Sequence, residues 1–401
     1  MRFSLTSLVR LIGFMALASS AAAVGLSRAL PEPSRVRRPA PPRYFGVNGG
    51  TLTPPSTRDY LIDAQTGSIA PVEFGRGVRL EFATCSPWSD GAGGVDLAGR
   101  AVSRTGTEHA SLCDGSGLAR FSLAARELSA RATEGPVISG RPSWVPGSPS
   151  RMIFPAGDGR LYAQDVADDG SGVVFDHGSD PSELDPGSAA RPIAWDCPTP
   201  GDGPPIHGDP VCPPIPALGG RLFVSLSVGE ERDGRRVYGP WRLWWLKLDP
   251  TGARVVDAGR LIRPDDSTGG DAGLVDERLP SFTVTPDGRV AVAYLSRDRR
   301  ESLWKLRVAA LAAGAGTAEP SAEAGEVRTV SDDCAVLTPP VSPDGRWVYA
   351  VSRSPVGRGV GSVPRYDLAA HLDAPESGEP PSRVAARRSP ARPGESPGRV
   401  W

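Results

Sequence analysis

The sequence has 401 residues, with 45 basic and 46 acidic side chains and a formal net charge of −1 at pH 7. A chain of this length can bury a core without disulfide or metal staples. Its net charge gives no global field that would hold a nucleic acid, and its 48 glycines and 42 prolines indicate a chain that turns often rather than a helical protein.

The N-terminus has the layout of a secretory signal peptide. Arg2 and Arg10 form a basic region, residues 11–17 are apolar, and residues 18–23 are small. This pattern predicts a signal at residues 1–23, cleaved after Ala23, and an exported protein that is periplasmic or extracellular. The alternative is an uncleaved membrane anchor, because residues 11–27 carry no charge and approach the length of a spanning helix.

Two further segments are expected to lie outside the folded domain. Residues 24–43 are rich in Pro and Arg, which is typical of a solvated linker. Residues 373–401 offer almost nothing apolar to bury, so we expect a disordered tail. The folded domain is therefore predicted at residues 44–372.

One phrase occurs twice in the second half of the chain. Residues 279–295 read LPSFTVTPDGRVAVAYL, and residues 338–352 read TPPVSPDGRWVYAVS. Pro presets the backbone of a tight turn, Asp bonds back to the main chain, and Gly takes the left-handed conformation that closes a hairpin. Each copy therefore predicts a strand, a turn of structural rather than functional role, and a second strand. The turn residues are Pro286, Asp287, Gly288, Pro343, Asp344 and Gly345.

Looser copies extend this pattern towards the N-terminus. Residues 142–154 repeat the first phrase without its Asp, and residues 60–67 and 245–252 share an aromatic-led strand that ends in a Thr-Gly turn. Four-stranded units repeated every ~40–50 residues are the pattern of a β-propeller. The predicted fold class is all-β, a β-propeller of about six four-stranded blades, with five or seven as alternatives.

The predicted units span residues 44–71, 78–132, 137–176, 191–261, 279–330 and 334–372. The first unit is short, and the last is expected to end after its third strand. Because a propeller can close its ring by joining its termini, we expect residues 44–47 to pair with the last unit around Tyr366.

The phrase Ser-Pro-Asp-Gly at residues 342–345, followed by an aromatic strand, resembles the TolB-type (WD-like) β-propeller repeat. Residues 285–288 are similar, and the copy at residues 144–149 departs from the pattern. The resemblance covers about a third of the chain. It implies a propeller fold and no particular activity.

Cys197 and Cys212 bracket a Pro- and Gly-rich insert. In an oxidising compartment, a disulfide between them would tie this loop. His207 and Asp209 lie between the two cysteines, so a zinc site is the alternative, which the compartment disfavours.

A tryptophan-rich segment is the main candidate for ligand contact. On a strand, Trp241 and Trp245 share one face and Trp244 takes the other, so that face could stack on a sugar or an aromatic ligand. The alternative is ordinary packing between blades.

Acidic side chains crowd residues 265–277 and offer the hard oxygens that calcium prefers. Their spacing matches no known calcium loop, which favours a solvated loop. No metal site is therefore predicted.

The sequence contains no Gly-x-Ser-x-Gly, His-Glu-x-x-His, Walker A or Cys-x-x-Cys motif. We therefore predict no catalytic residue and no cofactor. The expected function is a non-enzymatic binding or scaffolding platform for a protein, peptide or glycan in the cell envelope. The alternative is a hydrolase or lyase with carboxylates such as Glu134 or Asp158 in a central funnel. A monomer is expected, with no nucleic-acid partner and with membrane contact only through an uncleaved anchor.

Overall fold

The structure is a computed structural model. It describes the backbone of the strands between residues 44 and 132 and at 174–175, and it describes residues 139–144, 151–165, 190–201, 205–263, 275–312, 319–323, 326–334, 339–350 and 364–373 with nearly all of their side chains. The chain divides into two units, Met1–Ala40 and Pro41–Trp401, and all described residues belong to the second. The predicted signal peptide and linker, and the tail beyond Asp373, lie outside the described residues.

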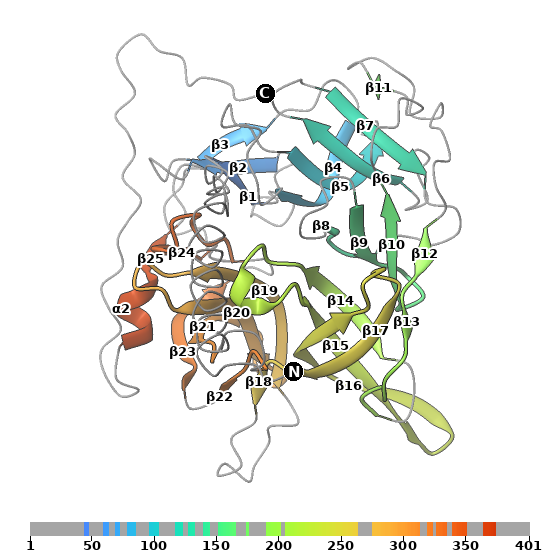
Figure 1. Cartoon of the computed structure of the whole chain (residues 1–401). Coiled ribbons are helices and arrows are strands. Elements are labelled where there is room, and N and C mark those ends of the chain that lie inside the picture. The colour runs from blue at the N-terminus through green and yellow to red at the C-terminus, as the bar shows by residue number, and fades with distance from the viewer. Residues whose placement is uncertain are drawn as a thin grey trace, which may run out of the picture. The chain divides into compact units, whose positions relative to one another are not determined.

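The described elements are almost all β-strands, and strands that follow one another in the chain pair in antiparallel sheets (Figure 1). The first sheet holds β1 (Tyr44–Val47), β2 (Asp59–Asp63) and β3 (Ile69–Val72). The second has β4 (Val78–Cys85), β5 (Asp96–Ser103), β6 (Gly117–Ser122) and β7 (Glu127–Ala132), with β11 (Val174–Phe175) on β7.

The next two sheets repeat the same up-and-down order. The third contains β8 (Ser143–Trp144), β9 (Arg151–Pro155), β10 (Leu161–Asp165) and β12 (Arg191–Pro192). The fourth contains β14 (Ile206–Val211), β15 (Leu222–Arg232), β16 (Arg235–Leu248) and β17 (Arg254–Arg260), with β13 (Ala194–Trp195) parallel to β17. A 3-10 helix, η3 (Pro216–Leu218), joins β14 to β15.

The fifth sheet contains β19 (Val275–Val284), β20 (Val290–Asp298), β21 (Trp304–Ala310) and β23 (Arg328–Cys334). Two short strands, β18 (Ile262–Arg263) before β19 and β22 (Ala322–Glu323) between β21 and β23, form a separate parallel pair. The last sheet contains β24 (Trp347–Tyr349) and β25 (Arg365–Asp367), and the helix α2 (Leu368–Asp373) follows.

The strand sequences explain which sheets are covered on both faces. In β21, Trp304, Leu306 and Val308 are buried on one face, as the period of two in a strand requires. The apolar run of β20, Val290 to Leu295, is buried on both faces together with Ser296, which is typical of a strand enclosed between two layers.

Consecutive sheets pack face to face. Leu161 of the third sheet shares a core with Val224 and Leu246 of the fourth. Phe223 and Trp245 of the fourth share one with Val292 and Tyr294 of the fifth. The same relation joins the fifth sheet to the last, through Leu306 and Val348. Four-stranded up-and-down sheets that pack on their neighbours in chain order are the blades of a β-propeller. The predicted all-β propeller fold is confirmed, and the number of six blades stays a prediction.

The repeated turns have closely similar geometry. The Gly288 N–H donates to the Thr285 carbonyl at 2.9 Å, and the Gly345 N–H donates to the Ser342 carbonyl at 2.9 Å. Both glycines have positive φ, 89° and 72°. The carboxylates of Asp287 and Asp344 accept from the hydroxyls of Thr285 and Ser342 and from the backbone N–H two residues on. The Pro residues that precede them, Pro286 and Pro343, occupy the first turn position.

Two sequence expectations about strand pairing are wrong. The segment β1 pairs with β2 through Tyr44 and Asp63, and β25 pairs with β24, so β1 does not complete the last unit. The third unit takes its fourth strand from residues 191–192, whereas residues 174–175 join the sheet before it. These pairings join strands separated by long loops, and turn chemistry alone does not specify such partners.

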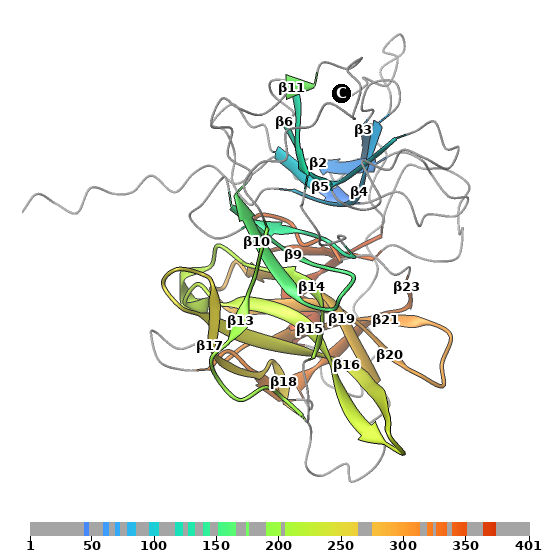
Figure 2. The same ribbon diagram turned by 90° about the vertical axis from the view of Figure 1, so that its right-hand side faces the viewer.

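The β15–β16 hairpin extends beyond its sheet (Figure 2). Its outer part pairs from Gly229 and Tyr238 to Arg232 and Arg235, past the last residue of β15 that pairs with β14, Ser227. We call residues 229–238 the arm. Positive φ angles at Asp233 (51°) and Gly234 (69°) close its tip, as a two-residue hairpin turn requires. Within the described residues, no helix is long and apolar enough to span a membrane.

Candidate functional site

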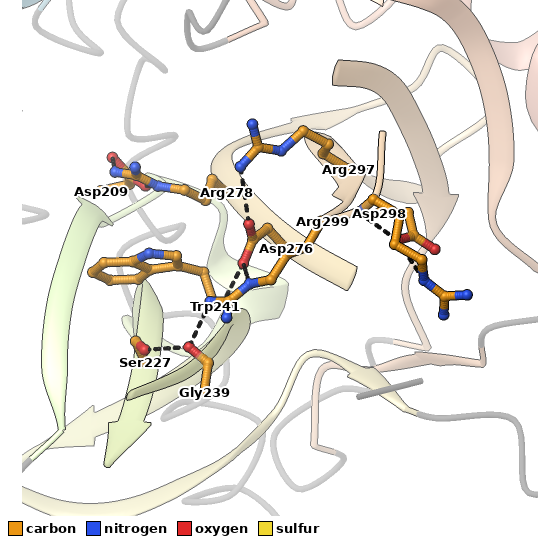
Figure 3. Close-up of polar contacts among 10 residues, drawn as sticks. Asp209, Ser227, Gly239, Trp241, Asp276, Arg278, Arg297, Asp298 and Arg299 are labelled. Atoms are coloured by element: carbon orange, nitrogen blue, oxygen red, sulfur yellow. Dashed lines mark hydrogen bonds and ion pairs between the residues drawn. The ribbon is translucent and has the colours of Figure 1, made fainter. Parts of the chain in front are cut away.

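A cluster of charged side chains lies where the fourth and fifth sheets meet. Its carboxylates are Asp209, Asp276 and Glu277, and its guanidinium groups are Arg242, Arg260, Arg278, Arg297 and Arg299. We call this set the arginine cluster (Figure 3 shows most of it). The three carboxylate residues are 6%, 3% and 7% exposed. Buried carboxylates must be paired and hydrogen-bonded, and each of them is.

Local backbone irregularities direct these side chains inward. Asp209 has a φ of 52° and lies in a register shift of β14 between Gly208 and Val211. Leu279 has a φ of 58° and lies in a register shift of β19 between Arg278 and Ser281. Such irregularities re-aim side chains at the edge of a pairing, and here they bring Asp209 and Arg278 of different sheets together.

Asp209 and Arg278 form a two-pronged ion pair. Arg278 donates from Nε to Oδ2 at 2.9 Å and from Nη2 to Oδ1 at 3.2 Å. Oδ2 also accepts from the Ser225 hydroxyl at 3.0 Å and from the Leu279 N–H at 3.3 Å. The charge of Asp209 raises the pKa of the Arg278 guanidinium. The same guanidinium lies over the Trp241 ring, 4.8 Å from its centroid.

Asp276 holds the second pair of guanidinium groups (Figure 3). Its carboxylate accepts from Arg297 Nη2 at 3.3 Å, from Arg299 Nε at 3.1 Å and from the Trp241 N–H at 3.0 Å. Arg299 also donates from Nη2 to the Gly239 carbonyl at 2.8 Å. Asp276 therefore orients Arg297 of β20 and Arg299 in the turn that follows, and links both to β16 of the neighbouring sheet.

Glu277 lies between two further arginines. Its carboxylate accepts from the Leu243 N–H at 3.1 Å and lies 4.0 Å from Arg242 Nη1 and 3.7 Å from Arg260 Nη2. Burial raises the pKa of the Glu277 carboxyl, and the charges of Arg260 and Arg242 oppose this. Burial also lowers the pKa of the Arg242 guanidinium, and repulsion from Arg260 adds to the effect.

The cluster holds more positive than negative groups, since five guanidinium groups face three carboxylates. The arginine side chains of the Asp276 pair are the most open, with Arg297 at 32% and Arg299 at 38% exposed. A guanidinium offers five N–H donors in a rigid fork. The arrangement can therefore present spare, preorganised donors to an anionic oxygen.

The predicted aromatic face exists, but its two rings have different surroundings. Trp241 pairs with Ser227 and Trp245 with Phe223, so their side chains leave β16 on the same face. Trp245 is 1% exposed and belongs to the core, which leaves no open face for a ligand. Trp241 is half-buried beside Arg278, and stacking on a ligand stays a prediction for this ring.

The structure does not show the predicted Cys197–Cys212 disulfide, because both are free cysteines. Both side chains contact the core between the third and fourth sheets, and burial raises the pKa of the Cys212 thiol to about 12. Of the alternative zinc ligands, Asp209 is committed to Arg278. No group of three or more potential metal ligands occurs in the described part of the chain.

The acidic residues of the expected solvated loop are divided. Asp276 and Glu277 are buried and ion-paired rather than solvated, because β19 already begins at Val275. Residues 264–274 lie outside the described residues, as does Glu134. Asp158 is exposed and accepts a hydrogen bond from the Tyr162 hydroxyl at 2.8 Å.

Sequence reasoning did not find the arginine cluster. The charges Asp276-Glu277-Arg278 and Arg297-Asp298-Arg299-Arg300 are visible at the far ends of one predicted hairpin, and Asp276 lies opposite Arg297 in the register. This cross-strand pair was therefore the available signal.

The sequence matches no family model and no curated protein. Among solved structures, the chain is similar to an oligogalacturonate lyase from Vibrio parahaemolyticus, with 12% identity over 82% of this chain and 70% of that one and a TM-score of 0.36. A protein of unknown function from Dyadobacter fermentans gives 11% identity, 82% and 88% coverage and a TM-score of 0.45.

The β-propeller domain of Cps50 (Swd1) from Myceliophteria thermophila gives 10% identity, 86% coverage of both chains and a TM-score of 0.39. All three TM-scores lie below 0.5, so these likenesses carry no conclusion about the activity, ligand or partners of this chain.

Proposed function

We propose that this protein is an exported, non-enzymatic β-propeller that acts as a binding or scaffolding platform for a protein, peptide or glycan partner in the cell envelope. The observation that supports a binding role is the arginine cluster, in which buried carboxylates hold half-open guanidinium groups in fixed positions. Donors that are already ordered cost little further entropy when a ligand binds.

The same observation argues against the hydrolase or lyase alternative at this site. A pair of catalytic carboxylates needs one group free to give up or accept a proton. Asp209 instead accepts four hydrogen bonds and Asp276 three, and two in each set come from arginine. The export part of the proposal rests on the N-terminal sequence pattern.

The test uses the full chain with a C-terminal tag, expressed with its own N-terminus and cross-linked in cells. We expect the protein in the envelope or medium fraction, with a specific partner that the wild type captures and the R297Q/R299Q double variant does not. The purified protein should leave a panel of glycans and peptides unchanged.

Turnover of any of these substrates that the double variant retains would show an enzyme with its site elsewhere. Recovery of the full chain, signal included, in the cytoplasm would overturn the export part.

A further inference from the structure

The arginine cluster carries a more specific inference, which rests on the proposed binding function. We propose that its open side binds the carboxylate or sulfate groups of an acidic glycan. Arg297 and Arg299 would contact the anionic oxygens, and Trp241 with the stacked Arg278 would border the sugar ring.

The first argument is the balance of charge. Three buried carboxylates neutralise three of five guanidinium groups, and the two most open arginines, Arg297 and Arg299, share the single carboxylate of Asp276. Two like charges held on one counter-ion repel each other, and an added anion relieves that repulsion. The net charge of the whole chain is −1, so this attraction belongs to the cluster and not to the molecule.

The second argument is the number of donors left over. Arg297 donates from Nη2 to Asp276 and its Nε is buried, so its Nη1 is the donor that remains for a ligand. Arg299 uses Nε and Nη2, which leaves its Nη1 for a ligand. An arginine fork matches the two oxygens of a carboxylate or a sulfate, and such charge-assisted bonds are the strong ones.

The third argument favours a sugar over an acidic peptide. Several cluster arginines lie over indole rings: Arg278 over Trp241 at 4.8 Å, Arg297 over Trp304 at 4.6 Å and Arg260 over Trp244 at 5.9 Å. Trp304 is buried in the core, so Trp241, which is half-buried, is the ring that can border a ligand. Stacking leaves the edge of a guanidinium free to donate. An acidic sugar carries its anion directly on a ring, so a donor edge beside a flat aromatic surface meets both parts of it.

The experiment measures binding of the purified full chain by calorimetry to dextran sulfate, hyaluronate, uncharged dextran, poly-L-glutamate and inorganic sulfate. We expect both acidic glycans to bind, with an affinity that falls as salt is raised, and uncharged dextran not to bind. Arg299→Gln should weaken glycan binding by about tenfold, as the loss of one charge-assisted contact does, and Arg299→Lys should weaken it less.

The matched control is Arg254→Gln. Arg254 is an exposed arginine of β17 that pairs with exposed Asp196 at 3.4 Å, so this variant removes the same charge from a place outside the cluster. It should bind as the wild type does. Thermal unfolding of each variant separates lost binding from lost folding. If Arg299→Gln does not fold, the affinity of the Arg299→Lys variant and the salt dependence of wild-type binding still test the proposal.

Equal loss in both Gln variants, or tighter binding of poly-L-glutamate than of either glycan, would overturn the proposal. Binding of inorganic sulfate alone would reduce the cluster to a small-anion site and also overturn it. A captured envelope partner with no glycan binding would leave the platform proposal standing, whereas glycan turnover would reject the platform and keep the cluster as a substrate site.

Discussion

At the scale of single residues, His207 shows how burial decides a side chain's chemistry. The ring is buried, its Nδ1 donates to the Gly159 carbonyl at 2.9 Å, and its Nε2 has no partner within the described residues. Burial lowers the pKa of His207 to about 4, against the opposing influence of the Gly159 hydrogen bond. In the sequence, His207 was a zinc ligand only under the disfavoured alternative to the disulfide, and the neutral ring with a donating Nδ1 fits a core residue.

This burial predicts a pH dependence of stability. Between pH 6.5 and about 4, the unfolded chain binds a proton at His207 that the folded chain refuses, so stability is full above pH 6.5 and falls as the pH drops towards 4. The loss is about 3 kcal/mol at most. His207→Asn keeps a donor for Gly159 without a titrating ring, and denaturant unfolding should show a flatter profile over this range. Parallel profiles for wild type and variant would contradict the assignment.

At the scale of elements, the two Pro-Asp-Gly turns look alike and are constrained differently. Both glycines have positive φ. A Cβ on Gly288 would meet nothing within 4 Å, whereas a Cβ on Gly345 would overlap the carbonyl oxygen of Val284 at the end of β19. The end of β19 thus leaves no room for a side chain at Gly345, whereas the space around Gly288 is open.

The pair of glycines gives a matched test. Gly288→Ala should cost about 1–2 kcal/mol, which is the price of a left-handed conformation for a residue with a side chain. Gly345→Ala should cost more, about 3 kcal/mol or above, because a backbone atom must also move. Equal costs in chemical denaturation would show that the last sheet does not pack on Val284 as described.

These turns also mark how far the sequence could specify the elements. Pro286, Asp287 and Gly288 act over four residues, and the sequence predicted their hairpin because such chemistry is local. The cross-strand pair of Asp276 and Arg297 could have been predicted from the same hairpin. The pairings of β11 with β7 and of β12 with β10 could not, because each closes a long loop and the closure entropy changes only slowly with loop length.

At the scale of the whole molecule, the ion pair of Asp209 and Arg278 links the fourth sheet to the fifth across 69 residues of sequence. No periodicity or turn signal relates such distant positions, so the repeat predicted the sheets but not the contacts between them. The choice of partners depends on the two register shifts that turn these side chains inward. The part of the cluster that joins the two sheets could therefore be recognised only in three dimensions.

Removing one member of this link should be costly. Asp209→Ala leaves Arg278 partly buried without its partner, and we expect a loss of about 3 kcal/mol, at the low end for buried pairs because Arg278 is 30% exposed. A double-mutant cycle with Arg278→Met measures the coupling. The exposed pair of Asp196 and Arg254 is the control and should couple by less than about 1 kcal/mol. Similar coupling in the two cycles would mean that the link between the sheets is no stronger than a surface contact.

The arm can change in length without a change in the sheet that carries it. Its register is fixed at one end by the tip turn at Asp233 and Gly234 and at the other by the sheet that contains β15 and β16. Because strand side chains alternate with a period of two, inserting two residues in each strand would lengthen the arm and leave every existing side chain on its own face. The exposed charged residues along it, such as Glu231 and Arg235, disfavour edge-to-edge association during such growth. The arm is thus a part of the molecule whose length can vary while the core stays the same.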